Sequence, residues 1–303
     1  MSPSRHARAS ARIRHGFTLI EIVITLTILG IVGAGLVKLI LVQARFSESQ
    51  MALRNARTVS RNAMNIMLTD LRMVQDKGGL LAASPDSVTV RIPVAFGLLC
   101  STVGGTTVSL LPVDSAMSAM ATYAGFAIRN DNTGEYTYTD ATTPGPIGSL
   151  TPGGAALCTA AGITGVTYGT RTSTIVTLTD AAPGAPQAGW PAFIYQQVTY
   201  KFAPSTAFPG PKRRGLWRIV KTNDPTKPGT DEIVAPFDSA TAKFRFYVLN
   251  ADVAQDAVPA NLNDVRGLEL VLAGSSNQPL SAGAQTKQAT MVTGVFFKNR
   301  RDP

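Results

Sequence analysis

The stretch from His15 to Gly30 reads HGFTLIEIVITLTILG, and apolar residues continue from Ile31 to Val42. The apolar run from Phe17 to Val42 is about 26 residues long, so an α-helix would extend it over about 39 Å, enough to cross a bilayer core. One carboxylate, Glu21, lies inside this run, where an unpaired charge costs several kcal/mol. The sequence therefore predicts a membrane helix with a buried charge that needs a partner.

The segment before this helix is basic. Residues 1–16 contain no acid and four arginines, which are Arg5, Arg8, Arg12 and Arg14. Positive charge close to a membrane helix keeps that end in the cytoplasm. We therefore expect a single-pass protein whose remaining residues face outward.

The run Gly16-Phe17-Thr18-Leu19-Ile20-Glu21, followed by unbroken apolar sequence, resembles the class III signal of type IV prepilins and type II secretion pseudopilins. This resemblance implies that prepilin peptidase cuts between Gly16 and Phe17 and methylates the new amino terminus at Phe17. It also implies that Glu21, the fifth mature residue, pairs with the amino terminus of a neighbouring subunit. Such an ion pair would offset much of the desolvation cost of both charges.

The same resemblance implies the partners and the location of the protein. The partners would be prepilin peptidase, other pilin or pseudopilin subunits that contact the N-terminal helix, and an inner-membrane assembly platform. The precursor would lie in the inner membrane with its C-terminal part in the periplasm. After assembly it would belong to a filament in the periplasm or at the cell surface.

Two simpler interpretations compete with this one. A secretory signal would be cut after a small residue, and Val42-Gln43-Ala44 could serve as that site, but its apolar core would be only 7–15 residues long. A plain signal anchor explains the length and the arginines, but it explains neither Glu21 nor the position of Gly16.

Histidine is confined to the leader, at His6 and His15. A mature chain that starts at Phe17 would therefore lack Ser-His-Asp triads, Cys-His pairs and histidine-bound zinc. Carboxylate mechanisms survive, but no motif indicates one, so we expect no enzyme and no cofactor. The net charge of +9 falls to +5 without the four leader arginines (24 basic minus 19 acidic residues), which makes a nucleic-acid partner unlikely.

The chain has two cysteines, Cys100 and Cys158, and both follow the membrane segment. In an oxidising compartment they could form a disulfide, and two buried thiols are the alternative.

From Gln43 to Asp76 the helical pattern continues with charges and without proline. An apolar stripe at Met64, Met67, Leu68, Leu71 and Val74 predicts one packed face, and glycines at 78–79 indicate a stop. The expected segments are a leader at 1–16, a membrane half of the helix at 17–42 and an amphipathic half at 43–79. A variable β-rich insertion at 80–197 and a C-terminal sheet at 198–303 follow.

Alternation of apolar and polar residues, or short β-like pieces in the middle of the chain, predict the strands. They are expected at Ser87–Ala95 (an edge strand, because of Pro93), Thr122–Arg129, Glu135–Thr139, Ser173–Thr179, Val198–Phe202, Arg214–Lys221, Asp231–Phe237, Ala242–Leu249, Val265–Leu272 and Met291–Arg300. The predicted fold is α+β and pilin-like, with a long, half-transmembrane helix on an antiparallel sheet that carries a large insertion.

The C-terminal part is similar to J-type minor pseudopilins and W-type minor pilins, through patterns such as Val198-Thr-Tyr200 and Leu216-Trp-Arg218. The ending Lys298-Asn299-Arg300 only approximates that of the family. Together with the N-terminal helix, the resemblance covers about 160 residues and leaves 97–191 unexplained.

Two further clusters carry less information. Lys212-Arg213-Arg214 could contact phosphate, although a solvated hairpin tip is the better interpretation. Asp252, Asp256 and Asp264 fit no known calcium loop, so scattered surface acids and no metal are expected.

The predicted function is structural: a minor pilin or pseudopilin that initiates or caps a type IV pilus or a type II secretion pseudopilus. Its size favours a minor subunit, because the major subunits of the family are usually much smaller. The alternative is a membrane-anchored exported binding protein or enzyme unrelated to filaments.

Overall fold

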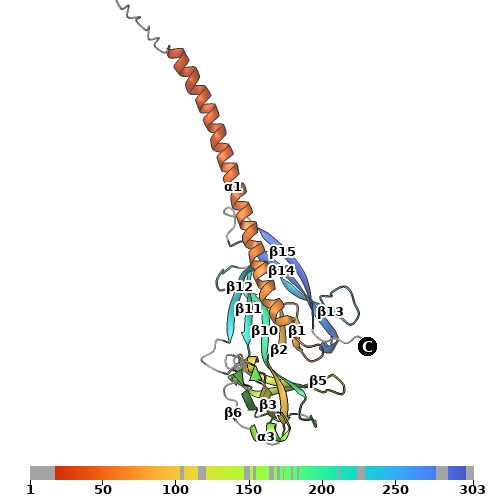
Figure 1. The fold of residues 1–303 in the computed structure, drawn as a ribbon. Helices are drawn as coiled ribbons and strands as arrows, with labels where there is room; N and C mark the ends of the chain where they lie inside the picture. The colour runs from red at the N-terminus through yellow and green to blue at the C-terminus, as the bar shows by residue number, and fades with distance from the viewer. Residues whose placement is uncertain are drawn as a thin grey trace, which may run out of the picture. The chain divides into compact units, whose positions relative to one another are not determined.

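The computed structural model describes residues 18–102, 106–114, 121–146, 151–152, 155–163, 167–168, 171–172, 174–178, 180–182, 184–210, 212–223, 229–277 and 286–297. The chain divides into two units, Met1–Met51 and Ala52–Pro303. Helix α1 (Leu19–Leu71) has 53 residues and belongs to both units (Figure 1).

All other described elements lie in the second unit. They are β1 (Leu80–Ser84), β2 (Ser87–Ser101), β3 (Thr106–Leu110), β4 (Thr122–Arg129), β5 (Tyr136–Pro146), β6 (Thr151–Pro152), α3 (Ala155–Ala160), β7 (Thr167–Tyr168), β8 (Arg171–Thr172), β9 (Thr174–Leu178), β10 (Pro191–Pro204), β11 (Arg213–Val220), β12 (Thr230–Asp238), β13 (Lys243–Val248), η2 (Leu262–Asp264), β14 (Val265–Ser275) and β15 (Gln288–Phe296).

One antiparallel sheet of 13 strands is organised around the pair β2 and β10. The two strands have 15 and 14 residues and pair from Pro191↔Leu98 to Lys201↔Ser87. On the side away from β10, β2 pairs first with β1 and then with β3. On the side away from β2, β10 pairs first with β4 and then with β11. The two long strands therefore join two halves of the sheet.

Each half of the sheet has its own apolar core. The first core contains Val88 and Val90 of β2, Tyr200 and Phe202 of β10, and apolar side chains of α1 and of β11 to β15. The second core lies further along the same strands, around Leu99, Phe126 and Ile194. Because side chains alternate along a strand, successive inward positions of β2 serve both cores.

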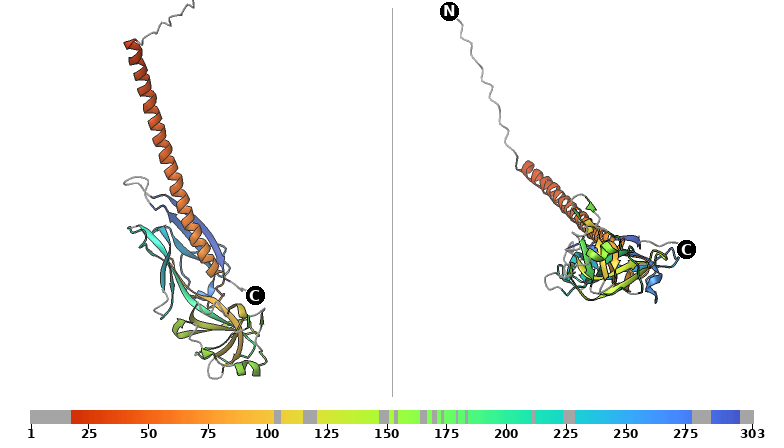
Figure 2. Two further views of the ribbon diagram at one scale, coloured as in Figure 1. Left: turned by 60° about the vertical axis from the view of Figure 1, so that its left-hand side comes forward. Right: turned by 60° about the horizontal axis from the view of Figure 1, so that its bottom comes forward.

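Helix α1 packs on the first core through one stripe. Its buried residues recur every three or four positions, at Ala52, Ala56, Ser60, Ala63, Met67 and Leu71. The first four are small, which lets the helix approach β14 closely: a Cβ at Gly274 would lie 2.2 Å from the backbone oxygen of Ala56. Figure 1 and the left view of Figure 2 both show the blue strands beside this part of the helix.

Polar contacts fix the helix on the sheet at two places. Ser60 is fully buried; its hydroxyl accepts a hydrogen bond from the Gly274 backbone N–H (2.9 Å) and lies within bonding distance of the Leu272 and Ala289 carbonyls. Near the end of the helix, Asp70 accepts a hydrogen bond from the Tyr200 hydroxyl and pairs with Arg218 at 3.3 Å. Burial, followed by the charge of Asp70, raises the pKa of Tyr200, so this phenol stays a donor.

The helix ends at Leu71, about five residues before the expected position near Asp76. Turns close it, since the N–H groups of Met73 and Val74 donate to carbonyls three residues back. Lys77 and Gly78 then adopt positive φ angles of 52° and 81°, so the glycine redirects the chain towards β1 rather than capping the helix.

The middle of the chain differs from the predicted insertion. β3, β4, β5, β6 and β9 belong to the same sheet as the C-terminal strands, and β10 runs through the expected boundary at 197/198. Pro93 does not mark an edge strand: it lies inside β2, next to a register shift opposite Ile194 and Tyr195. At such a bulge a missing N–H is tolerated. The end of the last predicted strand, Lys298 to Arg300, lies outside the described residues.

A disulfide joins Cys100 of β2 to Cys158 of α3, with a Cα–Cα distance of 4.7 Å. It ties a short helix of the middle segment to the second core. The sequence separation of 58 residues makes the closed loop a long one.

Gly274→Ala tests the close helix–sheet contact. We expect the free energy of unfolding to fall by about 1–3 kcal/mol, because the added methyl would overlap backbone atoms of α1. Gly210→Ala is the matched control, since its Cβ would meet only the flexible Arg213 side chain at 3.5 Å. Urea unfolding of the full chain in detergent measures both variants, and equal stability would contradict the close approach.

Replacing both cysteines, Cys100→Ser with Cys158→Ser, tests the disulfide. Loop-closure entropy predicts a loss of about 4 kcal/mol for this separation. The measurement is the urea midpoint with and without a reducing agent. Reduction should lower the midpoint of the native chain and leave that of the double variant unchanged; an unchanged midpoint for the native chain would contradict a stabilising bond.

Candidate functional site: the N-terminal helix

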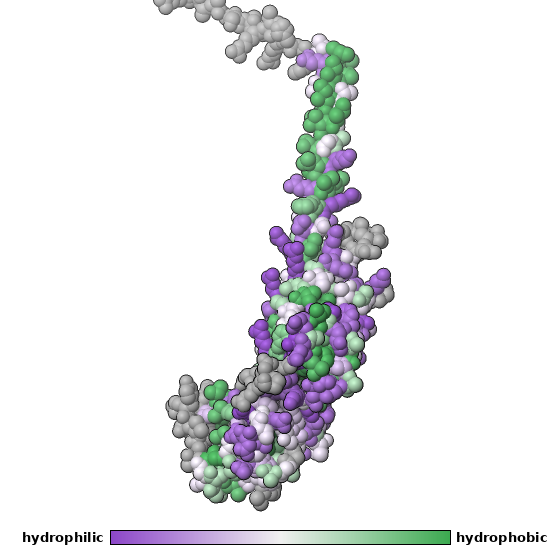
Figure 3. Space-filling model, turned by 90° about the vertical axis from the view of Figure 1, so that its right-hand side faces the viewer, coloured by the Kyte–Doolittle hydropathy of each residue, from purple (hydrophilic) through white to green (hydrophobic). Residues whose placement is uncertain are grey.

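The part of α1 in the first unit is covered with apolar side chains that nothing buries. Leu19, Ile31 and Val42 are 82%, 74% and 60% exposed, and the residues between them follow the same pattern. Figure 3 shows green, apolar side chains along this part of the helix. By length and composition, α1 is the one helix among the described residues that could cross a membrane. Water is an unfavourable environment for such a surface, which needs lipid or other protein around it.

Thr18 caps the start of this helix. The Glu21 backbone N–H donates to the Thr18 hydroxyl at 3.3 Å and to the Thr18 carbonyl at 3.1 Å. Thr18 and Glu21 thus occupy the first and last positions of a Thr-x-x-Glu capping pattern. The capping role of Thr18 was not predicted from the sequence, where Glu21 was considered only as a charge, although the Thr-x-x-Glu spacing was available as a signal.

Glu21 has no charged partner within the described residues, and its side chain is exposed. The threonines of the apolar segment are satisfied locally. Thr25 donates to the Glu21 carbonyl at 2.6 Å, and Thr27 lies within bonding distance of the Val23 and Ile24 carbonyls. Glu21 is the one acidic residue of this run, and among the described residues the helix supplies no partner for its carboxylate. Gly16 and Phe17, the expected cleavage position, lie outside those residues.

The two weaker clusters form structural contacts instead of sites. Arg214 pairs with Asp86 at 2.6 Å, and Arg213 donates to the Asn277 carbonyl at 2.8 Å, so neither is held ready for phosphate. The three aspartates do not converge: Asp256 contacts Lys243 and Arg245, Asp252 contacts Arg266, and Asp264 contacts Asn261. Among the described residues no group of three His, Cys, Asp or Glu side chains could hold a metal.

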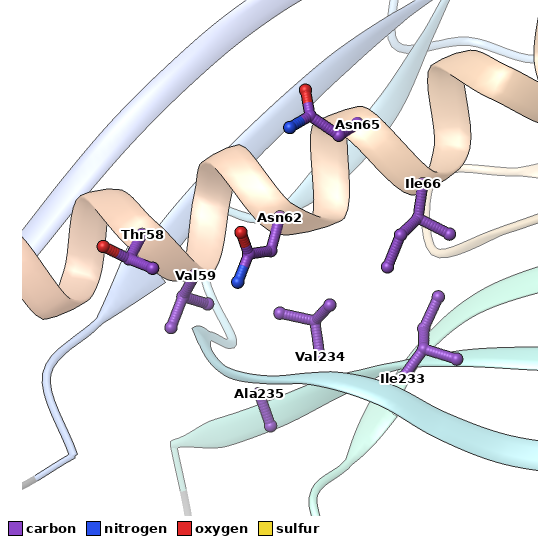
Figure 4. A pocket seen from close by; sticks show the side chains of 8 residues that line it. All are labelled: Thr58, Val59, Asn62, Asn65, Ile66, Ile233, Val234 and Ala235. Atoms are coloured by element: carbon purple, nitrogen blue, oxygen red, sulfur yellow. The ribbon is translucent and has the colours of Figure 1, made fainter.

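A groove of about 460 Å³ lies between α1 and β12 in the second unit. Figure 4 shows that both polar and apolar side chains of α1 line one side of the groove and that apolar side chains of β12 line the other. The lining residues are Thr58, Val59, Asn62, Asn65, Ile66, Ile233, Val234 and Ala235. None of them is a carboxylate, cation, thiol or imidazole, so the groove lacks the groups of general acid–base catalysis.

A polar cluster surrounds Arg91 of β2. Its guanidinium donates to Asp140 at 2.6 Å and to the Gly78 carbonyl, and it lies over the rings of Tyr138 and Tyr195 at 4.5 and 5.4 Å. Tyr195 also donates to Asp140, at 2.7 Å. This cluster holds the β4–β5 hairpin to β2, β10 and the chain after the helix, and its internal pairing gives it a structural role.

The comparisons with known proteins agree with the N-terminal helix. Residues 11–37 match the family model of the prokaryotic N-terminal methylation motif. The N-terminal segment of the chain therefore carries a type IV prepilin-like motif. No curated protein and no solved structure matches the chain. The motif implies processing by a peptidase and assembly with other pilin subunits, and together with the apolar helix it indicates a membrane-anchored single-pass protein.

The Arg91 cluster predicts a pH dependence of stability. Partial burial alone would raise the pKa of Asp140, but hydrogen bonds from Arg91 and Tyr195 outweigh it and lower this pKa. A carboxyl group with a lowered folded pKa stabilises the fold above its unfolded pKa of about 4, and this stability is lost as the pH falls through the folded pKa. Urea unfolding of the native chain should therefore show falling stability below about pH 4, and Asp140→Asn should fall less steeply. An identical slope for the two proteins would contradict the assignment.

Proposed function

We propose that this protein is a minor pilin or pseudopilin, a structural subunit that initiates or caps a type IV pilus or a type II secretion pseudopilus. The observation that carries the proposal is the carboxylate Glu21 near the start of the exposed, apolar part of α1, within a prepilin-like motif. An anchor needs only the apolar surface, whereas a carboxylate at this depth has a large desolvation cost.

A neighbouring subunit can supply the missing partner. If peptidase cleaves after Gly16, the new amino group at Phe17 is a cation at the start of the apolar helix. In a bundle of such helices, the amino group of one chain can meet Glu21 of another and offset the cost of both charges. This ion pair would draw an incoming subunit into register. The apolar run itself has no Lys, Arg or His before Lys38 that could take the place of the amino group.

The large second unit supports a minor role. It contains residues 52–303, and a sheet with two cores occupies it. A bulky second unit is accommodated most easily at the tip of a filament, because fewer neighbouring subunits surround it there. We propose the periplasmic side of the inner membrane as the place of assembly, and a structural function without catalysis.

Glu21 also occupies the capping position, so its charge and its capping role must be separated. Glu21→Gln keeps a residue that suits the third position of a capping pattern and removes the charge, whereas Glu21→Ala removes both. We expect both variants to insert into the membrane and both to lose incorporation into filaments, because the ion pair is absent in each. The measurement is the fraction of the chain that is recovered with sheared filaments or in cross-linked subunit complexes.

Normal incorporation of Glu21→Gln with loss for Glu21→Ala would assign Glu21 to helix capping alone. Normal incorporation of both variants would overturn the filament function and return the protein to the anchored binding proteins.

A further inference from the structure

The last strand of the sheet presents a regular row of backbone groups on its outer side. β15 pairs with β14 in an unbroken antiparallel register from Gly267↔Phe296 to Ser275↔Gln288. Just beyond its two ends, the Lys287 carbonyl accepts from the Ser276 N–H (2.8 Å) and the Phe297 N–H donates to the Arg266 carbonyl (2.9 Å). Positions 287 and 297 thus face β14.

Residues of an antiparallel strand face their partner alternately. Because 287 and 297 face β14, the intervening even-numbered residues direct their N–H and C=O groups to the other edge. These are Gln288, Thr290, Val292, Gly294 and Phe296. In the described part of the chain no strand pairs with that edge.

The other edges of the sheet carry protection against strand addition, and β15 does not. β12 contains Pro236 and has two register shifts, and β5 contains Asp140 and two prolines. β13 carries Lys243 and Arg245, and a bridge from Phe246 to Gln255 covers it. β1 and β6 have only five and two residues. β15 has nine residues without a charge, a proline or a bulge, and such an edge is a template for pairing with another chain.

We propose that the outer edge of β15 receives an extended strand of a neighbouring pilin-like subunit. This inference rests on the proposed assembly role, and it identifies the surface through which the second unit contacts a neighbouring subunit. Val292 and Phe296 are 58% and 53% exposed on the outer face, and they would pack beside the added strand. The added chain would contribute backbone hydrogen bonds for affinity and side-chain contacts for specificity.

The position of β15 favours a filament neighbour. The Ser60 hydroxyl of α1 lies 3.0 Å from the Ala289 carbonyl of β15, so β15 lies beside residues 52–71 of the helix. Since the prepilin-like motif implies assembly with other pilin subunits, another such subunit is the expected occupant of this edge. An antiparallel pair of two copies along β15 is disfavoured. In such a pair, residues 52–71 of the two chains would run in opposite directions, whereas chains anchored in one membrane need these helices to run in the same direction.

Two variants block the edge without removing a bond to β14. Val292→Lys adds a charge at an exposed position, and Thr290→Pro removes an outward N–H group. Val253→Lys is the matched control, since Val253 is 74% exposed in a loop away from the ladder. We expect incorporation into filaments to fall about tenfold for the two β15 variants, from the loss of one or two hydrogen bonds, and to stay unchanged for the control.

Glu21→Gln, analysed in parallel, separates this inference from the proposed function. Loss of incorporation for Glu21→Gln but not for the β15 variants would overturn the strand contact alone. Normal incorporation of all the variants would overturn both proposals. Unchanged urea midpoints show that the β15 variants are folded.

A photo-reactive benzoylphenylalanine at position 292 tests the contact in an otherwise native chain, in the native host. We expect an adduct with an extended segment of another protein that carries a prepilin-like motif, identified by mass spectrometry of the cross-linked peptide. An adduct with a second copy of this chain, an adduct with a protein without the motif, or no adduct would overturn the proposal.

Discussion

The pairing of β2 with β10 is the interaction on which the rest of the second unit depends. It runs from Pro191↔Leu98 to Lys201↔Ser87 and passes both apolar cores. Other strands add to this pair on either side, and the disulfide of Cys100 is attached to the end of β2. Because the pairing residues are about a hundred positions apart in sequence, the ladder also has a high entropic cost of closure. The many side chains buried along it offset that cost.

The first unit follows a different constraint. Its helix satisfies its own backbone and its threonines, but it leaves an apolar surface and one carboxylate exposed. Neither lipid nor water suits both features, whereas a bundle with the N-terminal helices of other pilin-like subunits suits them together. The contrast with the second unit is informative: there, Arg91, Asp70 and Ser60 are paired within the chain. The second unit has one comparable feature, which is the long, unprotected edge of the described sheet at β15. Like Glu21, this edge needs another chain to supply its partners.

Local patterns predicted much of this structure. The long apolar run from Phe17 to Val42 and the position of Glu21 indicated the N-terminal helix. Short β-like sequence indicated strands such as Thr122–Arg129, which the structure places at the same residues. The end of α1 was predicted too late because Val74 and Gln75 are buried by the sheet and not by a continued helix. Spacing alone cannot separate these cases.

Long-range relations were not accessible from the sequence. The short strands between 97 and 191 resembled a loop-rich insertion, because nothing local shows that β4 adds to β10 or β3 to β2. The role of Gly274 depends on Ala56 and Ser60, which are more than 200 residues away. The unprotected edge of β15 likewise appears only once the register with β14 is known. Capping by Thr18, in contrast, is a local feature that the Thr-x-x-Glu spacing could have predicted.

The most direct test of the account is the amino terminus of the protein extracted from membranes. Intact mass and N-terminal sequencing would be compared between cells with and without prepilin peptidase. The account predicts a chain that starts at N-methylated Phe17 only when the peptidase is present. A chain that starts at Arg45, or an uncut leader in both strains, would contradict it.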